Sequence, residues 1–295
     1  MPSPSSRRAR RWARNSRARA TARALAQLGA AVVVNDIGRD RDGGSTAERV
    51  VDEIRAAGGR AAANTDSVTD WNGAARMVEL GRREFGSVDI LVNNAGIAFS
   101  GSVWEVDAET FDRIVSTHAQ GSFYCSRHAI APMRERGWGR IVNLVSRAGI
   151  TGMPGSLPYA VGKGGVFGLI NALSRELDGS GITVNGVNPA STDTPMVAAA
   201  LENLAAMGEV GRKRAESLRA QMQKPEQVAV AIASLCLPGA AHINGQIFLV
   251  EHNRIGLFQP LTITQAVERG EPWTPAELCE TLGKLELHAL ADAYS

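Results

Sequence analysis

The sequence predicts an α/β fold, a single domain built on a doubly wound parallel sheet. Short apolar runs of strand length recur along its 295 residues, and segments long enough for a crossover helix separate them. Helix signals stand in those segments, which also favours helices on both faces of a sheet. The expected strands are Ala31–Val34, Ile90–Val92, Ile141–Val145, Ile182–Val187 and Ile247–Val250.

The clearest helix signal follows the first run. Ser45 and Glu48 form a capping box ahead of an apolar stripe with helical spacing. The Gly58-Gly59 pair then ends the helix before a short strand near Ala61. This stretch therefore predicts one βαβ unit.

Bulk composition excludes several classes of function. The net charge of +2 gives no field that would attract nucleic acid. The sequence contains no run of about 18 apolar residues, which would predict a membrane span. It also has no apolar leader, which would predict secretion. The three cysteines, Cys125, Cys236 and Cys279, are far apart and indicate neither a disulfide framework nor a metal site. We expect a cytoplasmic protein without metal, nucleic acid or membrane partners.

Three residues between the third and fourth runs predict acid–base chemistry. Open parallel sheets bind ligands beyond the carboxyl ends of their strands, so residues there are the candidates. Tyr159 and Lys163 are four residues apart, so on a helix the ammonium can lie near the phenol oxygen. Free tyrosine has a pKa of about 10, and a nearby cation favours the phenolate. Ser146 adds a hydroxyl donor for a substrate oxygen.

Together these residues resemble the short-chain dehydrogenase/reductase family, from about Ala20 to about Val250. Ser146, Tyr159 and Lys163 have the spacing of the family's catalytic serine, tyrosine and lysine. Further positions that match its cofactor-binding residues follow successive strands: Asp36, Asp66, Asn93, Asn94, Ala95, Gly96, Thr192 and Thr194.

The resemblance implies a Rossmann-type fold and hydride transfer between NAD and a secondary alcohol or ketone. Tyr159 would be the general acid or base, Lys163 would hold the nicotinamide ribose, and Ser146 would bind the substrate oxygen. Asp36 would bind the adenosine ribose and repel a 2′-phosphate, so NAD is expected over NADP, although Arg39 and Arg41 stand nearby.

The resemblance also implies a homodimer or homotetramer and a small hydrophobic alcohol or ketone as substrate. A 3-hydroxyacyl thioester, a steroid or terpenoid alcohol and other hydrophobic alcohols stay open. The rival function is a non-catalytic scaffold or oligomer subunit that retains the site residues but cannot hold the dinucleotide.

His118 departs from the family pattern, because it stands where the family usually has a catalytic asparagine. Relatives that resemble the peroxisomal multifunctional hydroxyacyl dehydrogenases carry histidine there. The imidazole is either a site residue that holds a water or a carbonyl, or a buried side chain satisfied by backbone. Gly162 also replaces a small polar residue beside Lys163.

The N-terminus departs furthest. The positions of the family's glycine-rich turn fall on Trp12, Ser16 and Ala18, and the arginines from Arg7 to Arg11 exclude a buried first strand. A transit peptide or arginine arm, a true loss of strand and loop, and a reading-frame or start-site error are the three explanations.

We therefore expect three segments: a basic segment over residues 1–19, the sheet domain over 20–250 and an extension over 251–295. Within the extension, Thr274 and Glu277 form a capping box around Pro275, which predicts the start of a helix.

Overall fold

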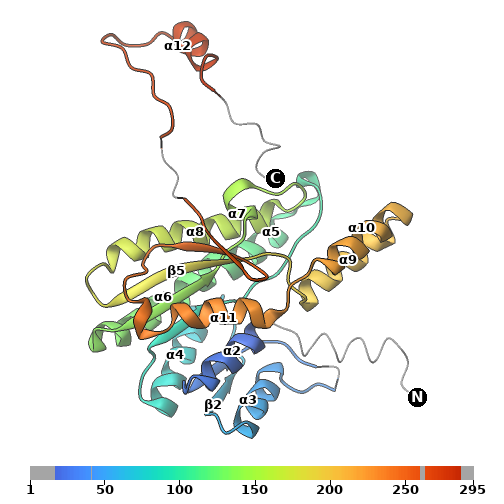
Figure 1. The fold of residues 1–295 in the computed structure, drawn as a ribbon, viewed down its shortest axis with the longest axis vertical. Coiled ribbons are helices and arrows are strands. Elements are labelled where there is room, and N and C mark those ends of the chain that lie inside the picture. The colour runs from blue at the N-terminus through green and yellow to red at the C-terminus, as the bar shows by residue number, and fades with distance from the viewer. Residues whose placement is uncertain (1–16, 41, 260–262, 287–295) are drawn as a thin grey trace. The chain divides into compact units, whose positions relative to one another are not determined.

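The computed structural model describes residues 17–40, 42–259 and 263–286, and the chain separates into two compact units, 1–257 and 258–295. In the first unit, parallel strands alternate with helices (Figure 1), which confirms the predicted α/β fold. The strands are β1 (Val32–Asn35), β2 (Ala61–Asn64), β3 (Ile90–Asn93), β4 (Gly139–Leu144), β5 (Ile182–Pro189), β6 (Ile247–Glu251) and β7 (Arg254–Leu257). The helices are α2 (Arg17–Gln27), α3 (Thr46–Ala56), α4 (Trp71–Phe85), α5 (Ala108–Val115), α6 (Gly121–Arg136), α7 (Ala148–Thr151), α8 (Leu157–Glu176), α9 (Pro195–Ala206), α10 (Glu209–Ala220) and α11 (Pro225–Leu235), with short turns of helix at Val103–Glu105 and Pro238–Ala240 and a π-helix, η2, at Ser116–Gln120.

The strands form two separate sheets. β1 pairs with β2 in parallel, whereas β3, β4, β5 and β6 pair in parallel in that order and β7 joins β6 antiparallel. Within the described part of the chain, no strand lies between β1 and β3. In doubly wound folds with strand order 3-2-1-4-5-6, the first strand lies between the second and the fourth. The break therefore coincides with the strand that the sequence analysis did not find, and residues 1–16 lie outside the described residues.

Helices cover both faces of the sheets. On one face α2 lies beside α11 (Figure 1), and Leu25, Val228 and Ile232 pack there against Val142 and Val187 of the sheet. On the other face α6 and α8 pack against β3, β4 and β5. Because β3, β4, β5 and β6 run parallel, their carboxyl ends meet at one common edge.

The first predicted helix begins and ends as expected. The Ser45 side chain accepts a hydrogen bond from the Glu48 N–H at 3.3 Å and caps α3. The apolar stripe of this helix is buried, and Gly58 adopts a positive φ of 83° after its end. That conformation favours glycine, so the pair at 58–59 stops the helix as predicted.

One hairpin was not predicted. β6 continues through a turn at His252 and Asn253 into β7, an exposed edge strand. His252 has a φ of 52°, and Gln223 secures it by accepting from its backbone N–H at 2.8 Å. The first unit thus extends past residue 250, where we expected the sheet domain to end.

The second unit contains α12 (Pro275–Leu282), which begins where predicted. The Thr274 hydroxyl accepts from the Glu277 N–H at 3.4 Å, and the Glu277 carboxylate accepts from the Thr274 N–H at 3.0 Å. Both halves of the predicted capping box are therefore formed.

Candidate active site

Tyr159 and Lys163 lie one turn apart on α8, at the edge where the strands end. The Lys163 side chain is buried, and its Nζ donates to the Leu144 carbonyl oxygen at 2.6 Å. The same nitrogen lies 5.9 Å from the centre of the Tyr159 ring, and the tyrosine is half-buried. The last residue of β4 thus holds a cation against a phenol.

Ser146 joins this pair because the segment that follows it packs directly on α8. A Cβ added to Gly149 would lie 2.5 Å from the Lys163 carbonyl carbon, so only glycine permits this approach. The half-buried Ser146 accepts from the Ala148 N–H through its Oγ at 3.3 Å. That bond leaves its hydroxyl proton available to another acceptor.

His118 belongs to the same cluster. It lies in the π-helix η2, and its ring meets the Tyr159 ring edge to face with centroids 5.1 Å apart. Its Nε2 lies 2.8 Å from the Ile97 carbonyl oxygen and 3.3 Å from the Ile97 backbone nitrogen. The contact with the carbonyl is the shorter, so we place the ring proton on Nε2. Nδ1 is then an acceptor, and it is buried with no hydrogen-bond partner among the described residues. Both interpretations of His118 agree in part with the structure: a backbone carbonyl satisfies one nitrogen, and the other has no hydrogen-bond partner among the described residues.

Two glycines make room for this imidazole. A Cβ at Gly96 would collide with the His118 ring, and one at Gly162 would lie 3.0 Å from the His118 Cβ. Gly162 is the position where the sequence departs from the family pattern beside Lys163. The larger side chain at 118 and the missing one at 162 are therefore complementary in volume.

Burial and charge set the protonation of the cluster. Burial, followed by the positive charge of Lys163, lowers the pKa of His118 to about 3, so the imidazole is neutral near pH 7. Burial, followed by the positive charge of Arg17, lowers the pKa of Lys163 to about 7. Arg17 is the first residue of α2 and also interacts with Tyr159. Arg17 was not among the predicted site residues, although it lies between two of the positions that match the family's glycine turn, Ser16 and Ala18.

Asp36 follows β1, as predicted, and organises the loop behind it. Its Oδ1 accepts from the Gly38 N–H at 2.7 Å, and a Cβ at Gly38 would lie 2.9 Å from that oxygen. Arg39 is turned into its own loop, where its Nη1 donates to the Gly43 carbonyl at 3.0 Å. Arg41 lies outside the described residues.

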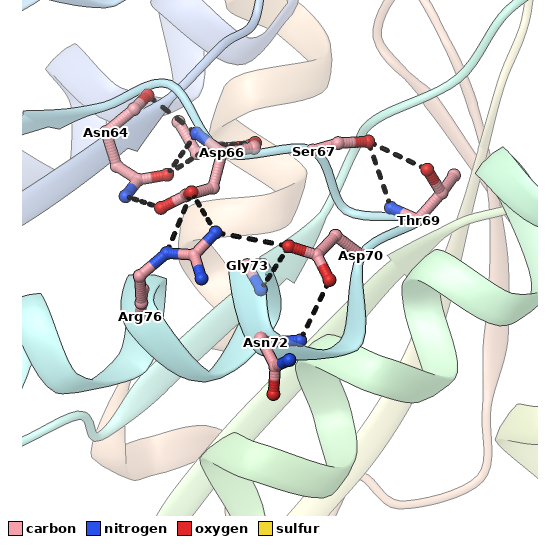
Figure 2. A network of polar contacts seen from close by, with 9 residues as sticks. Asn64, Asp66, Ser67, Thr69, Asp70, Asn72, Gly73 and Arg76 are labelled. Atoms are coloured by element: carbon pink, nitrogen blue, oxygen red, sulfur yellow. Dashed lines mark hydrogen bonds and ion pairs between the residues drawn. The ribbon is translucent and has the colours of Figure 1, made fainter.

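Asp66 lies at the end of β2 in a network of polar contacts (Figure 2). Arg76 on α4 donates to its Oδ1 through Nε at 2.9 Å, and Asn64 donates to its Oδ2 at 2.8 Å. Asn35, beside Asp36, donates in turn to the Asn64 Oδ1 at 2.7 Å. The network therefore links the ends of β1 and β2. Arg76 and Asn64 were not among the predicted site residues. Arg76 lies on α4, so no spacing rule links it to Asp66, whereas Asn64 is only two residues from Asp66.

The segment after β3 presents a mixed surface. The Asn93 side chain faces the protein, where its Nδ2 donates to the Asn143 Oδ1 at 2.9 Å. The Asn94 Oδ1 is buried without a hydrogen-bond partner in the described chain, and Ala95 is exposed. An unpaired acceptor beside a small exposed residue suits the approach of a flat ligand.

Thr192 and Thr194 lie after β5 and differ in environment. Thr192 is fully buried, and its hydroxyl donates to the Ala190 carbonyl at 2.8 Å and accepts from the buried Gln223 at 3.3 Å. Thr194 caps α9 by accepting from the Val197 N–H at 3.4 Å. Of the two hydroxyls, that of Thr194 is the one with a proton not used in these bonds.

The described residues contain neither a membrane-spanning helix nor a cluster of metal ligands. None of their helices is long and apolar enough to cross a membrane. They also contain no group of three or more His, Cys, Asp or Glu side chains that could hold a metal ion.

Comparison with known proteins gives one consistent result. The sequence model of a family described as enoyl-(acyl carrier protein) reductase matches residues 13–252. The cis-4-hydroxycyclohexanecarboxylate dehydrogenase of Sinomonas cyclohexanicum is 36% identical over 79% of this chain and 89% of its own. The hydroxyacyl-CoA dehydrogenase ChsB1 of Mycobacterium tuberculosis is 33% identical over 90% of this chain and 83% of its own. A crystal structure of a short chain dehydrogenase from Mycobacterium avium superposes with a TM-score of 0.78 at 33% identity, covering 93% of this chain and 92% of that one.

Proposed function

Because this chain belongs to the short-chain dehydrogenase/reductase family, we propose that it transfers hydride between NAD(H) and a hydrophobic secondary alcohol or its ketone. One observation carries the proposal. The buried ammonium of Lys163 is held against the Tyr159 ring at the carboxyl edge of the sheet, with the His118 ring beside the phenol. The segment that follows Ser146 packs on the same helix. A cation, a phenol and a hydroxyl donor together suit proton transfer at a carbonyl oxygen.

In this proposal the phenol oxygen of Tyr159 is the general acid or base that exchanges a proton with the substrate oxygen. Lys163 favours the phenolate by its charge. The Ser146 hydroxyl donates a hydrogen bond to the substrate oxygen, where negative charge develops. The nicotinamide, when bound, supplies the hydride chemistry. His118 is neutral, and its Nδ1 would accept a hydrogen bond from a water or from the Lys163 ammonium during the reaction.

The residues at the strand ends suit the rest of a dinucleotide. Asp36 and Asp66 would take the adenosine half, the backbone around Asn94 and Ala95 would lie along it, and the Thr194 hydroxyl would meet the carboxamide. The carboxylate at Asp36 repels a 2′-phosphate, and Arg39 is engaged with its own loop, so NAD is preferred over NADP.

Relatives suggest two substrate classes to test. One relative is named for a cyclic hydroxy acid and another for a hydroxyacyl-CoA, so we propose cyclic secondary alcohols and 3-hydroxyacyl thioesters. We also propose that the protein is cytoplasmic and a homodimer or homotetramer, as the family resemblance implies. Light scattering of the purified chain tests the assembly.

A second function rests on the sequence at the start of α2. Arg17 and Ala18 stand where the family has its glycine turn. Side chains at these positions favour a non-catalytic subunit with impaired dinucleotide binding.

A fluorescence titration with NADH separates the two functions. Saturable enhancement, followed by turnover of a secondary alcohol with NAD, supports the enzyme. No enhancement at millimolar NADH excludes the enzyme and leaves the scaffold.

A further inference from the structure

We propose that Arg76 is a positioning residue for base recognition: it fixes the Asp66 carboxylate so that one acceptor position is left for the amino group of an adenine. The inference rests on the proposed function, because it assumes that a dinucleotide binds along the strand ends. It concerns the adenosine end, away from Tyr159 and Lys163.

Three hydrogen bonds occupy the Asp66 carboxylate. Arg76 uses one carboxylate oxygen twice, because its Nε and Nη2 both donate to Oδ1 (Figure 2). Asn64 uses the other oxygen, Oδ2, once at 2.8 Å. A carboxylate offers about four acceptor positions, so one on Oδ2 stays open to an N–H donor.

The Asp66 carboxylate is also held in a fixed orientation. Arg76 also donates to the Asp70 Oδ2 at 3.1 Å, and Asp70 caps α4 by accepting from the Gly73 N–H at 3.0 Å. The guanidinium therefore connects Asp66 to the first turn of the helix. A planar, branched donor of this kind fixes orientation better than a lysine would.

Gly73 at the start of α4 allows the backbone to pack closely around the same network. A Cβ at Gly73 would lie 2.8 Å from the Ser67 carbonyl oxygen and 3.2 Å from the Asp66 Cβ. Glycine at this position lets the loop that follows Asp66 pack closely on α4. The Asp66 side chain keeps 23% of its surface exposed, which is enough to meet a ligand.

An ionised carboxylate with one open acceptor selects for a base that presents a donor. Adenine presents its amino group, whereas hypoxanthine presents a carbonyl oxygen at the same position. The carboxylate attracts the first group and repels the second. Recognition of the base therefore depends on the placement of Asp66, and that placement depends on Arg76.

The experiment compares NADH with reduced nicotinamide hypoxanthine dinucleotide by fluorescence titration, so it needs no turnover. The variants are Arg76→Gln, Arg76→Lys and Gly73→Ala. Arg82→Gln is the matched control, because it removes the same charge from an exposed position of the same helix.

We expect the wild type and Arg82→Gln to prefer NADH by about tenfold, the scale of one hydrogen bond to a charged group. Arg76→Gln and Gly73→Ala should reduce the preference to about twofold, and Arg76→Lys should restore part of it. A merely structural role would weaken the binding of both dinucleotides equally.

Two outcomes overturn the inference alone: binding of both dinucleotides with equal affinity by the wild type, or an unchanged preference in Arg76→Gln. Failure of the wild type to bind either dinucleotide overturns the proposed enzyme function and this inference together. Circular dichroism of each variant identifies a failure to fold, and in that case Arg76→Lys provides the measurement.

Discussion

His118 and Tyr159 meet edge to face, with an interplanar angle of 89° between their rings. This contact places a neutral imidazole next to the phenol proposed as the acid or base. Because the proton on Nε2 is directed to the Ile97 carbonyl, the nitrogen that is left for the site is an acceptor. The site thus has the acceptor character of an amide oxygen where the family pattern has asparagine.

His118→Asn should leave the shape of the pH–rate profile unchanged between about pH 5 and pH 8. The pKa of His118 is lowered to about 3, so the imidazole does not change charge in that range. The measurement is turnover against pH for the wild type and the variant. An inflection near pH 6.5 that disappears in the variant would contradict the assigned protonation.

Gly96→Ala should destabilise the protein by about 1–3 kcal/mol, because the new methyl group collides with the His118 ring. The double variant Gly96→Ala, His118→Asn should recover part of that loss, since asparagine is smaller. Thermal unfolding of the wild type, the two single variants and the double variant gives the coupling. Additive losses would show that the two positions do not compete for space.

Lys163→Met should raise the thermal stability most at low pH. The pKa of Lys163 is lowered in the folded state to about 7, against about 10.4 in an unfolded chain, so between these values the unfolded state binds the extra proton. Wild-type stability therefore rises with pH across this window, and methionine removes that dependence. The difference in Tm should be largest below pH 7 and should shrink toward pH 10. A difference independent of pH would contradict the burial of a titrating ammonium.

Tyr159→Phe should reduce turnover by roughly 10²–10⁴-fold, the usual contribution of general acid–base catalysis. Affinity for NADH should change little, because the ring and its contact with His118 are retained. Steady-state kinetics and a fluorescence titration measure the two quantities. Turnover at the wild-type rate would remove Tyr159 from the acid–base role.

Asp36→Ser should shift the cofactor preference from NAD toward NADP. Serine removes the charge that repels a 2′-phosphate and can still accept from the Gly38 N–H. The ratio of kcat/KM for the two cofactors is the readout. An unchanged ratio would mean that another group selects the cofactor.

The sequence predicted those elements whose signals are local. Strand ends, the Ser45 cap and the Thr274 cap all depend on residues within a few positions of each other. The structure has both caps where expected, and the strands end within two residues of the predicted positions. The β7 hairpin was missed because its turn at His252 lacks glycine and is secured by Gln223, 29 residues away. Long-range support of this kind leaves no periodic pattern in the chain.

The candidate site was predictable to a similar extent. Tyr159 and Lys163 share one helix, so their spacing alone placed them together. The contact of His118 with Gly96 and Gly162, and that of Arg76 with Asp66, join different elements, so no spacing rule could predict them. Volume complementarity and ion pairing between elements become visible only in three dimensions.

The break between β1 and β3 divides the proposed cofactor site between two pieces of sheet. Asp36 and Asp66 belong to the two-stranded piece, whereas Tyr159 and Lys163 belong with the five-stranded one. Side-chain packing, with Val32 and Ile90 against one core cluster, joins the pieces without a ladder of backbone hydrogen bonds between the described strands. A dinucleotide that contacts both sheets would link them. On binding, amide hydrogen exchange should therefore slow more in β1 and β2 than in β4 and β5.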